Sequence, residues 1–176
     1  MIFTAQDGYA ANTTFQQIQK HAAYLVIREH GKKDGDFPRI LQGKAWLSPG
    51  PFYLVWKEGS VLKDQVPWPY QLVRIEIVDF AKKYSRIFPA GAKSSRAVSE
   101  GFSLFKSQCL RCHSVNLQGG TIGPELNAPR NVTEYWARRN LEEFIANAPS
   151  FRYRSKMPAF PQLSKTDIKK ILSYLH

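Results

Sequence analysis

Sulfur is scarce in this 176-residue chain, which has two cysteines and two methionines. A zinc site built on one Cys-x-x-Cys pair needs a second pair of ligands, and no such pair is recognisable in the sequence. Long apolar runs are also missing. The longest, 22–27, is far shorter than the roughly 18–20 residues that a membrane-spanning helix requires. The first half of the chain has neither an internal repeat nor a low-complexity tract.

The chain has too few acidic residues to balance its basic ones. It contains 25 Lys and Arg against 14 Asp and Glu, a net charge of +11. The excess is +5 in residues 1–95 and +6 in residues 96–176, so it is not the clustered basic footprint of a nucleic-acid-binding protein. It is consistent either with solubility or with an acidic redox partner. A hydrophobic content of 43% indicates a globular chain.

Both cysteines belong to one motif, Cys109-Leu-Arg-Cys112-His113. This spacing is typical of covalent attachment of a c-type haem, in which each thiol joins one vinyl group and the adjacent histidine is the proximal iron ligand. The alternatives are a redox disulfide and half of a zinc site, but neither the strand-to-helix context of the first nor the second ligand pair of the second is apparent.

Met157 is the candidate for the sixth iron position, because the only other methionine is Met1. A thioether favours reduced iron and raises the reduction potential. Pro158 disfavours a helical conformation at Met157, which suits a ligand on an extended loop. The alternative is that Met157 fills the core. The remaining histidines, in positions 21, 30 and 176, are interpreted as surface residues.

Other residues are predicted to complete the haem site. The Pro124 carbonyl is the candidate acceptor for the free ring N–H of the proximal histidine. Trp136 is a candidate hydrogen-bond donor to a haem propionate. Candidates to pair with a propionate are also Arg138, Arg139, Arg152 and Arg154.

With these motifs, residues 96–176 resemble a class I (monohaem) cytochrome c domain. Gly101 and Phe105 precede Cys109 by eight and four residues, and they resemble the glycine and aromatic that pack on the family's last helix. The loops 123–126 and 156–160 also match the family pattern. The resemblance implies a small all-α wrap around one covalent haem c and one-electron transfer without bond-making chemistry.

The helices of this half are also indicated by the residues themselves. Ser164 and Asp167 form a cap-like start to a helix over 165–175, whose apolar residues recur at helical spacing. A second helix is predicted to start at Thr133, with Asn131 as the alternative cap, and to run to Ile145 before Pro149.

Residues 1–80 are predicted to form a small mixed α/β domain. We expect a helix over 14–29 and strands near 3–5, 52–56 and 73–80. This half resembles, weakly, the rear part of a sulfite-oxidase-type molybdopterin domain, in Asp-Gly-Tyr at 7–9 and in the runs 49–56 and 71–77. That family's metal ligand is a cysteine, and both cysteines of this chain belong to the haem motif. No molybdenum cofactor is therefore expected, and the domain is interpreted as a degenerate scaffold or a docking module.

The predicted organisation is an α+β two-domain chain: 1–80, a polar linker over 81–95, and the all-α haem domain over 96–176. The aromatic loop Trp68-Pro69-Tyr70 is either a docking surface or a loop that packs on its own domain. Both cysteines are committed to the haem, and no second cofactor site is recognisable.

The leading hypothesis for function is an electron carrier, or the cytochrome subunit of a periplasmic redox complex. A two-domain redox enzyme and a haem-based gas sensor are the alternatives. Haem attachment in the resembled family occurs outside the cytoplasmic membrane. We therefore expect an extracytoplasmic location and a signal or anchor that has been removed from this chain. The partner is expected to be a redox protein with an acidic surface, and not a nucleic acid.

Overall fold

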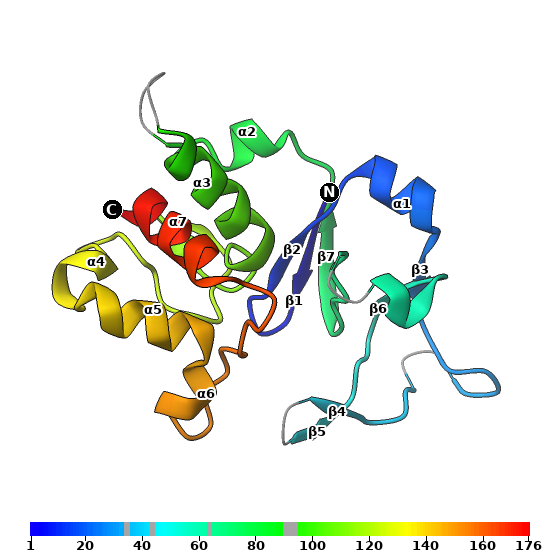
Figure 1. The fold of residues 1–176 in the computed structure, drawn as a ribbon. Helices are drawn as coiled ribbons and strands as arrows, with labels where there is room; N and C mark the ends of the chain where they lie inside the picture. The colour runs from blue at the N-terminus through cyan, green and yellow to red at the C-terminus, as the bar shows by residue number, and fades with distance from the viewer. Residues whose placement is uncertain (34–35, 43–44, 63–64, 90–94) are drawn as a thin grey trace. The chain divides into compact units, whose positions relative to one another are not determined.

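The computed structural model describes residues 1–33, 36–42, 45–62, 65–89 and 95–176. The chain divides into two compact units, Met1–Asp79 and Phe80–His176 (Figure 1). No helix in these described ranges is long and apolar enough to cross a membrane.

The first unit is built on an antiparallel sheet of three strands. β1 (Ile2–Ala5) lies between β2 (Ala10–Asn12) and β7 (Leu72–Glu76), which gives the order β2-β1-β7. The pairing of β1 with β7 joins the two ends of this unit. Its core is a cluster of buried side chains, namely Phe3, Ala11, Leu54, Trp56, Leu62, Val66 and Leu72.

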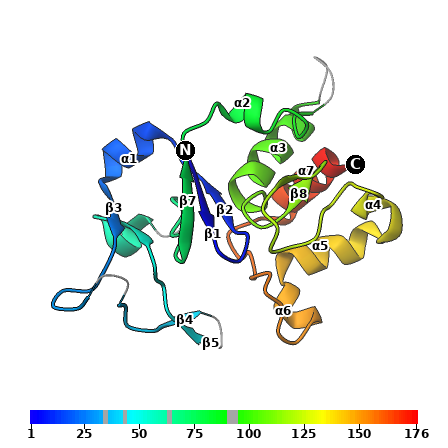
Figure 2. The same ribbon diagram turned by 180° about the vertical axis from the view of Figure 1, so that it is seen from behind.

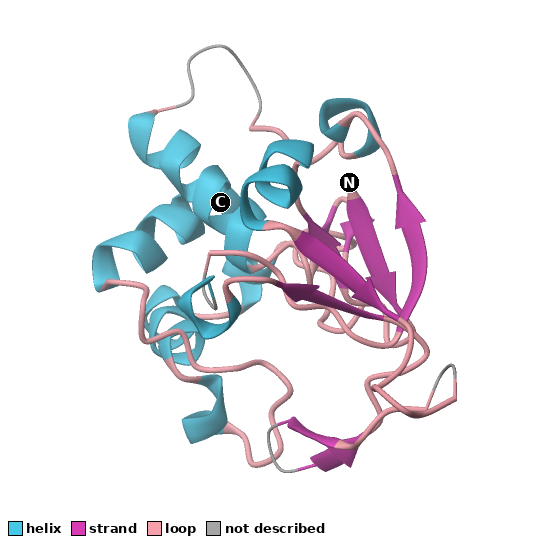
Figure 3. Cartoon of the chain, turned by 90° about the vertical axis from the view of Figure 1, so that its right-hand side faces the viewer, coloured by secondary structure: helices cyan, strands magenta, loops and turns pink. Residues whose placement is uncertain are grey.

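Short two-stranded pairs complete the first unit (Figure 3). β3 (Ala23–Val26) pairs with β6 (Tyr53–Trp56), and β4 (Ile40–Gln42) pairs with β5 (Ala45–Leu47). A 3₁₀ turn, η1 (Gly59–Leu62), follows β6. The prediction of a mixed α/β composition therefore agrees with the elements that this unit contains.

The prediction of one helix over 14–29 is wrong. α1 spans only Phe15–His21, capped by the Thr14 side chain, and Ala22 ends it in the left-handed conformation with φ of 46°. β3 then begins at once. Leu25 and Val26 do recur at helical spacing with Phe15, but their backbone pairs with β6, so tertiary pairing overrides the helical pattern.

The aromatic loop at 67–70 packs into its own unit, which is the second of the two alternatives that the sequence left open. Pro69 is among the most deeply buried side chains of the chain. The Trp56 indole N–H donates to the Pro67 carbonyl at 2.7 Å, and Trp68 packs against the core cluster. This loop therefore belongs to the interior of the first unit and is not a free docking surface.

The second unit is organised around the crossing of two helices, α3 (Arg96–Gln108) and α7 (Lys165–Leu175). Gly101 sits at the crossing, where any side chain would collide with the carbonyl of Lys170. Phe105 is fully buried, and its ring lies 5.2 Å from that of Tyr174. The residues that the sequence assigned to this contact are therefore in it.

The region between these helices contains three short helices, where the sequence predicted one. α4 (Val132–Tyr135), α5 (Arg138–Ala146) and α6 (Ala148–Phe151) follow in order. The Asn131 side chain, not Thr133, caps α4 by accepting from the Thr133 amide at 2.8 Å. The helix breaks at Trp136, which has an extended backbone.

Two further features of the second unit differ from the prediction. It is not wholly α-helical, because β8 (Ser114–Val115) and β9 (Gln118–Gly119) form a small hairpin, of which β8 is labelled in Figure 2. The start of the expected linker is structured: α2 (Phe80–Lys83) begins it, and Tyr84 and Ile87 are buried. The later part of the expected linker, 90–94, lies outside the described residues.

Candidate haem-attachment site

The end of α3 presents the Cys-x-x-Cys-His motif as one compact turn. Cys109 caps the helix, with its amide bonded to the Phe105 carbonyl at 2.8 Å. The amides of Cys112 and His113 both donate to the Cys109 carbonyl, at 3.0 and 2.9 Å. This turn holds the two thiols and the imidazole on one short piece of backbone at the end of a rigid helix.

The state of the thiols argues against the redox alternative. Cys109 and Cys112 are not joined by a disulfide. Burial raises the pKa of the Cys109 thiol to about 12, and nearby Arg111 opposes only part of this rise. Redox-active Cys-x-x-Cys motifs depend on a lowered thiol pKa, and the shift at Cys109 has the opposite direction.

The zinc alternative has no ligand set in the part of the chain that the structure describes. Within the described residues, no group of three or more His, Cys, Asp or Glu side chains is arranged to hold a metal ion. The thiol pair therefore has one histidine beside it in the sequence and, among the described residues, no second pair of such ligands with it. This set matches the chemistry of haem attachment better than that of a closed tetrahedral site.

The imidazole of His113 is held in one tautomer by Pro124. Its Nδ1 lies 2.9 Å from the Pro124 carbonyl oxygen. A carbonyl can only accept, so Nδ1 carries the proton and Nε2 is the nitrogen able to bind iron. Burial lowers the pKa of His113, and the bond to Pro124 offsets part of that shift. The ring is thus neutral near pH 7, as a metal ligand must be.

Gly123 lies against the same ring. A Cβ at this position would overlap the imidazole atoms, so only glycine allows the loop to approach so closely. The Gly123 amide also donates to the Cys112 carbonyl at 2.8 Å. The loop is therefore bonded to the motif at two points. Gly123 bonds the backbone of Cys112, and Pro124 bonds the ring of His113.

Glu125, which the sequence reasoning missed, organises the loop that comes after the motif. Its carboxylate accepts from four backbone amides at 2.9–3.1 Å, those of Asn116, Leu117, Asn127 and Ala128. Burial alone would raise the pKa of Glu125, but hydrogen bonds from Ser114 and from the amides of Asn127, Ala128 and Leu117 lower it overall. One signal was present in the sequence: Glu125 is the only acidic residue between Glu100 and Glu134.

Met157 lies on a non-helical loop and is half-buried. The loop is fixed on both sides. The Ser155 hydroxyl donates to the Met157 carbonyl at 3.2 Å, Asn147 and Ala159 form a β-bridge, and the Phe160 amide donates to the Ala146 carbonyl at 3.1 Å. The loop is thus anchored to the end of α5.

Trp136, the candidate hydrogen-bond donor to a propionate, is half-buried, with its ring 5.1 Å from that of Phe144. The four candidate arginines fall into two groups. Arg138 and Arg139 are already engaged: Arg138 bonds the Lys169 carbonyl at 3.1 Å and pairs with a glutamate, as does Arg139. The second group, Arg152 and Arg154, is exposed and has no carboxylate partner among the described residues.

Comparison with known proteins supports a haem function for the second unit. Residues 96–175 match the model of the family described as cytochrome C oxidase, cbb3-type, subunit III. The chain is also 29% identical, over 83 residues, to a cytochrome c oxidase subunit 2 from Alkalihalophilus pseudofirmus. The match covers 44% of this chain and 24% of that protein. No solved structure matches.

These matches support a cytochrome c domain at residues 96–175, and such a domain implies haem c and haem-based electron transfer. The family match does not extend into residues 1–95. The resemblance of the first unit to a molybdopterin domain stays a prediction.

Proposed function

We propose that this chain transfers single electrons through one haem c, which Cys109 and Cys112 would attach and whose iron His113 and Met157 would bind. The observation that carries the proposal is the hydrogen bond from His113 to Pro124, next to a cysteine pair that forms no disulfide. Bound haem would supply an iron that changes its oxidation state by one electron.

The protein's contribution on the proximal side is to hold a neutral, oriented imidazole. Pro124 accepts the Nδ1 proton, which raises the basicity of Nε2. Gly123 lets the loop close over the ring, and Glu125 holds the loop by its backbone amides. The ring therefore need not reorient when the charge of the site changes, which favours fast electron transfer.

The Met157 loop is the proposed source of the second iron ligand. A thioether stabilises reduced iron and raises the reduction potential relative to an open or nitrogen-ligated site. The anchors of this loop to the end of α5 would hold the sulfur in place. Trp136 remains a proposed hydrogen-bond donor to a propionate.

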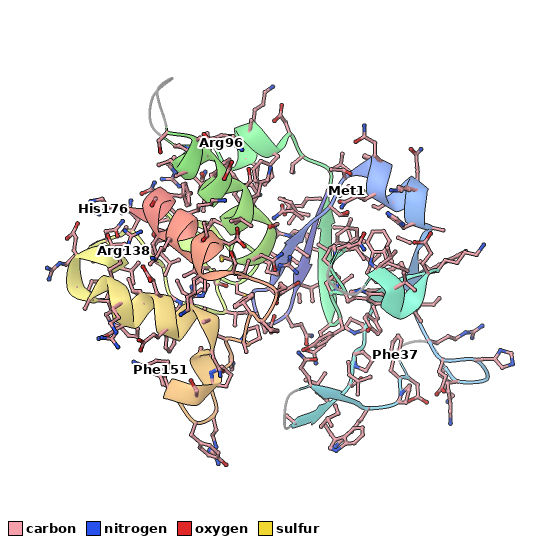
Figure 4. All side chains as sticks on the ribbon, in the orientation of Figure 1. Met1, Phe37, Arg96, Arg138, Phe151 and His176 are labelled. Atoms are coloured by element: carbon pink, nitrogen blue, oxygen red, sulfur yellow. The ribbon has the colours of Figure 1, made fainter. Side chains whose placement is uncertain are left out.

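The proposed partner is a redox protein with an acidic surface. Next to Met157 the chain exposes Phe151 and Tyr153, with 51% and 77% of their surface accessible, and the cations Arg152, Arg154 and Lys156 (Figure 4 labels Phe151). Aromatic residues and arginine are enriched in protein interfaces. We call residues 151–156 the basic aromatic loop.

The proposed context is extracytoplasmic, because thiol attachment of haem in the resembled family takes place there. Both comparisons concern subunits of oxidases, which favours a cytochrome subunit of a larger redox complex over a free carrier. The first unit is proposed to carry no molybdenum cofactor, since both cysteines are used in the haem motif.

The test uses the full chain produced with a haem-attachment system. We expect an intact mass equal to polypeptide plus one haem, haem that acid–acetone does not extract, and low-spin iron in both oxidation states. Met157→Ala should open the site to carbon monoxide and lower the reduction potential, while Lys156→Ala, the neighbouring control, should leave the spectrum unchanged. Extractable haem would refute attachment, and an unchanged Met157→Ala spectrum would refute the ligand assignment.

A further inference from the structure

The segment from Phe80 to Phe88, which we call the clasp, lies outside the stretch that matches the cytochrome family. It contains α2 and buries two side chains, Tyr84 and Ile87, which are 4% and 1% exposed. The ring of Phe88 lies 5.1 Å from that of Phe102 on α3, and the Tyr174 hydroxyl on α7 donates to the Ile87 carbonyl at 2.6 Å. The clasp is therefore packed on the helix crossing as part of the second unit.

The clasp is also bonded to the hairpin that comes directly after the haem motif. Gln118 makes two of these bonds: its Oε1 accepts from the Arg86 amide at 2.8 Å, and its Nε2 donates to the Lys83 carbonyl at 2.9 Å. Asn116 makes the third, donating from Nδ2 to the Arg86 carbonyl at 2.7 Å. All three contacts join residues at least 30 positions apart in the sequence.

The turn of this hairpin contains a leucine in an unfavourable backbone conformation. Its two turn residues, Asn116 and Leu117, have φ of 52° and 63°, a left-handed conformation that leucine rarely adopts. Leu117 is 70% exposed, so packing of its side chain does not hold the turn. The turn is held instead by hydrogen bonds, from its amides to Glu125 and from Asn116 to the clasp.

The hairpin connects directly to the proximal ligand. Ser114, in β8, follows His113 and pairs with Gly119 in β9. Glu125, which holds the turn, follows Pro124, the hydrogen-bond acceptor of the imidazole. A displacement of the hairpin would therefore move Ser114, which is adjacent to His113, and Glu125, which is adjacent to Pro124.

We propose that Gln118 and Asn116 are positioning residues for the proximal histidine, and that the clasp is the fixed element against which they hold it. This inference rests on the proposed function, because it takes His113 as an iron ligand. Its consequence is that the strength of the His113–Pro124 hydrogen bond depends on residues of the 80–88 segment.

The test is made on the full haem-loaded chain with Gln118→Ala, which removes two of the three bonds. The double variant Gln65→Ala/Asn140→Ala removes exposed amides elsewhere and is the control. We expect solvent exchange of the His113 Nδ1 proton, followed by NMR, to be at least about tenfold faster in Gln118→Ala. The reduction potential should rise, because a weaker bond to Pro124 makes the imidazole a weaker donor to oxidised iron.

A conservative variant separates positioning from folding. Gln118→Glu keeps an acceptor for the Arg86 amide and loses the donor to Lys83, so its exchange rate and potential should lie between those of wild type and Gln118→Ala. It also serves if Gln118→Ala does not fold. The inference is overturned if Gln118→Glu and any folded Gln118→Ala match the control in both measurements. A wild-type chain without a covalent haem spectrum would instead refute the proposed function.

Discussion

Gly123 and Glu125 stand on either side of Pro124, and each controls a different property of the proposed haem-attachment site. Gly123 determines how closely the loop approaches the imidazole, since a side chain there would occupy the space of the ring. Glu125 determines the shape of the loop, since its carboxylate is bonded to four amides. The first effect is steric and independent of pH, whereas the second depends on charge.

Gly123→Ala should push the loop away from His113 and weaken the bond to Pro124. Overpacking of this kind costs about 1–3 kcal/mol. We expect a lower denaturant midpoint for the haem-loaded chain and a shifted Soret spectrum. Thr121→Ala, in the same loop, is the control and should change neither. Wild-type stability and spectrum in Gly123→Ala would contradict the close contact.

Glu125→Gln should remove a pH-dependent part of the stability. The pKa of Glu125 is lowered in the folded chain, so its contribution is complete above the ordinary value of 4.5 and is lost as the pH falls below it. We expect Glu125→Gln to reduce the free energy of unfolding at pH 7 by about 1–3 kcal/mol. The difference from wild type should shrink in acid.

The measurement for Glu125 is urea unfolding between pH 3 and pH 7. The control is Glu134→Gln, an exposed glutamate paired with Arg130, which should be nearly neutral. A constant difference between Glu125→Gln and wild type across this range would show that the charge of Glu125 is not the property that stabilises the loop.

Sequence reasoning identified residues whose chemistry is unusual and missed a residue whose role is only geometric. The motif of Cys109, Cys112 and His113 can be recognised from residue spacing alone. The Pro124 carbonyl, predicted as the acceptor for the imidazole N–H, lies within hydrogen-bond distance of it. The role of Glu125 depends on the directions of four backbone amides. Two of them, those of Asn116 and Leu117, belong to a left-handed turn that the local sequence does not predict.

Among the helices and strands of the second unit, α3 and α7 form the central packing contact. A side chain at Gly101 would meet the backbone carbonyl of Lys170, which cannot move aside as a flexible side chain could. Gly101→Ala should therefore separate the two helices and lower the stability by about 3 kcal/mol or more. Ser103→Ala, exposed on the same helix, is the control.

The measurement for Gly101 is the denaturant midpoint of the haem-loaded chain, together with the Tyr174 environment by near-ultraviolet circular dichroism. An unchanged midpoint in Gly101→Ala would mean that the crossing is looser than the structure indicates.

Helix boundaries were predictable where a cap fixes them. Ser164 and Asp167 form a reciprocal capping box, and α7 spans the predicted 165–175. The helix over 14–29 and the helix over 133–145 were overpredicted, because apolar spacing continues across Ala22 and Trp136 while the helical backbone does not. In both places the end of the helix is set by the backbone conformation of one residue, and after Ala22 also by the long-range pairing of β3 with β6.

For the chain as a whole, the relevant property is an excess of positive charge, with cations in the basic aromatic loop that have no carboxylate partner among the described residues. Arg152→Ala/Arg154→Ala should slow electron transfer to an acidic partner, most strongly at low salt. The control, Arg130→Ala/Arg139→Ala, removes the same net charge from arginines that are paired with Glu134 and Glu143.

The measurement is the bimolecular electron-transfer rate with an acidic redox protein over a salt series. The Debye length falls from about 30 Å at 0.01 M to about 10 Å at 0.1 M, so the loop variant should show a flatter salt dependence than the control. Equal slopes for both double variants would place the docking surface elsewhere.

The composition change near residue 80 was visible in the sequence, but the packing of the residues after it was not. The stretch after Asp79 is polar and basic, which is typical of a linker. Its few apolar residues, Phe80, Tyr84, Ile87 and Phe88, have no obvious period, yet they pack on the helix crossing. Their partners on α3 and α7 are far away in the sequence, so only the tertiary structure reveals them.

The clasp also bears on how such a chain can be inherited and recombined. A genetic exchange at residue 96, where the family resemblance begins, would leave Gln118 and Asn116 without their partners and would uncover the surface that Tyr84 and Ile87 now fill. An exchange just before Phe80 would keep every one of these contacts. The unit that could be exchanged intact, residues 80–176, is therefore longer than the stretch that matches the family, residues 96–175. Proteins that arise from a successful fusion should contain the clasp together with its hairpin.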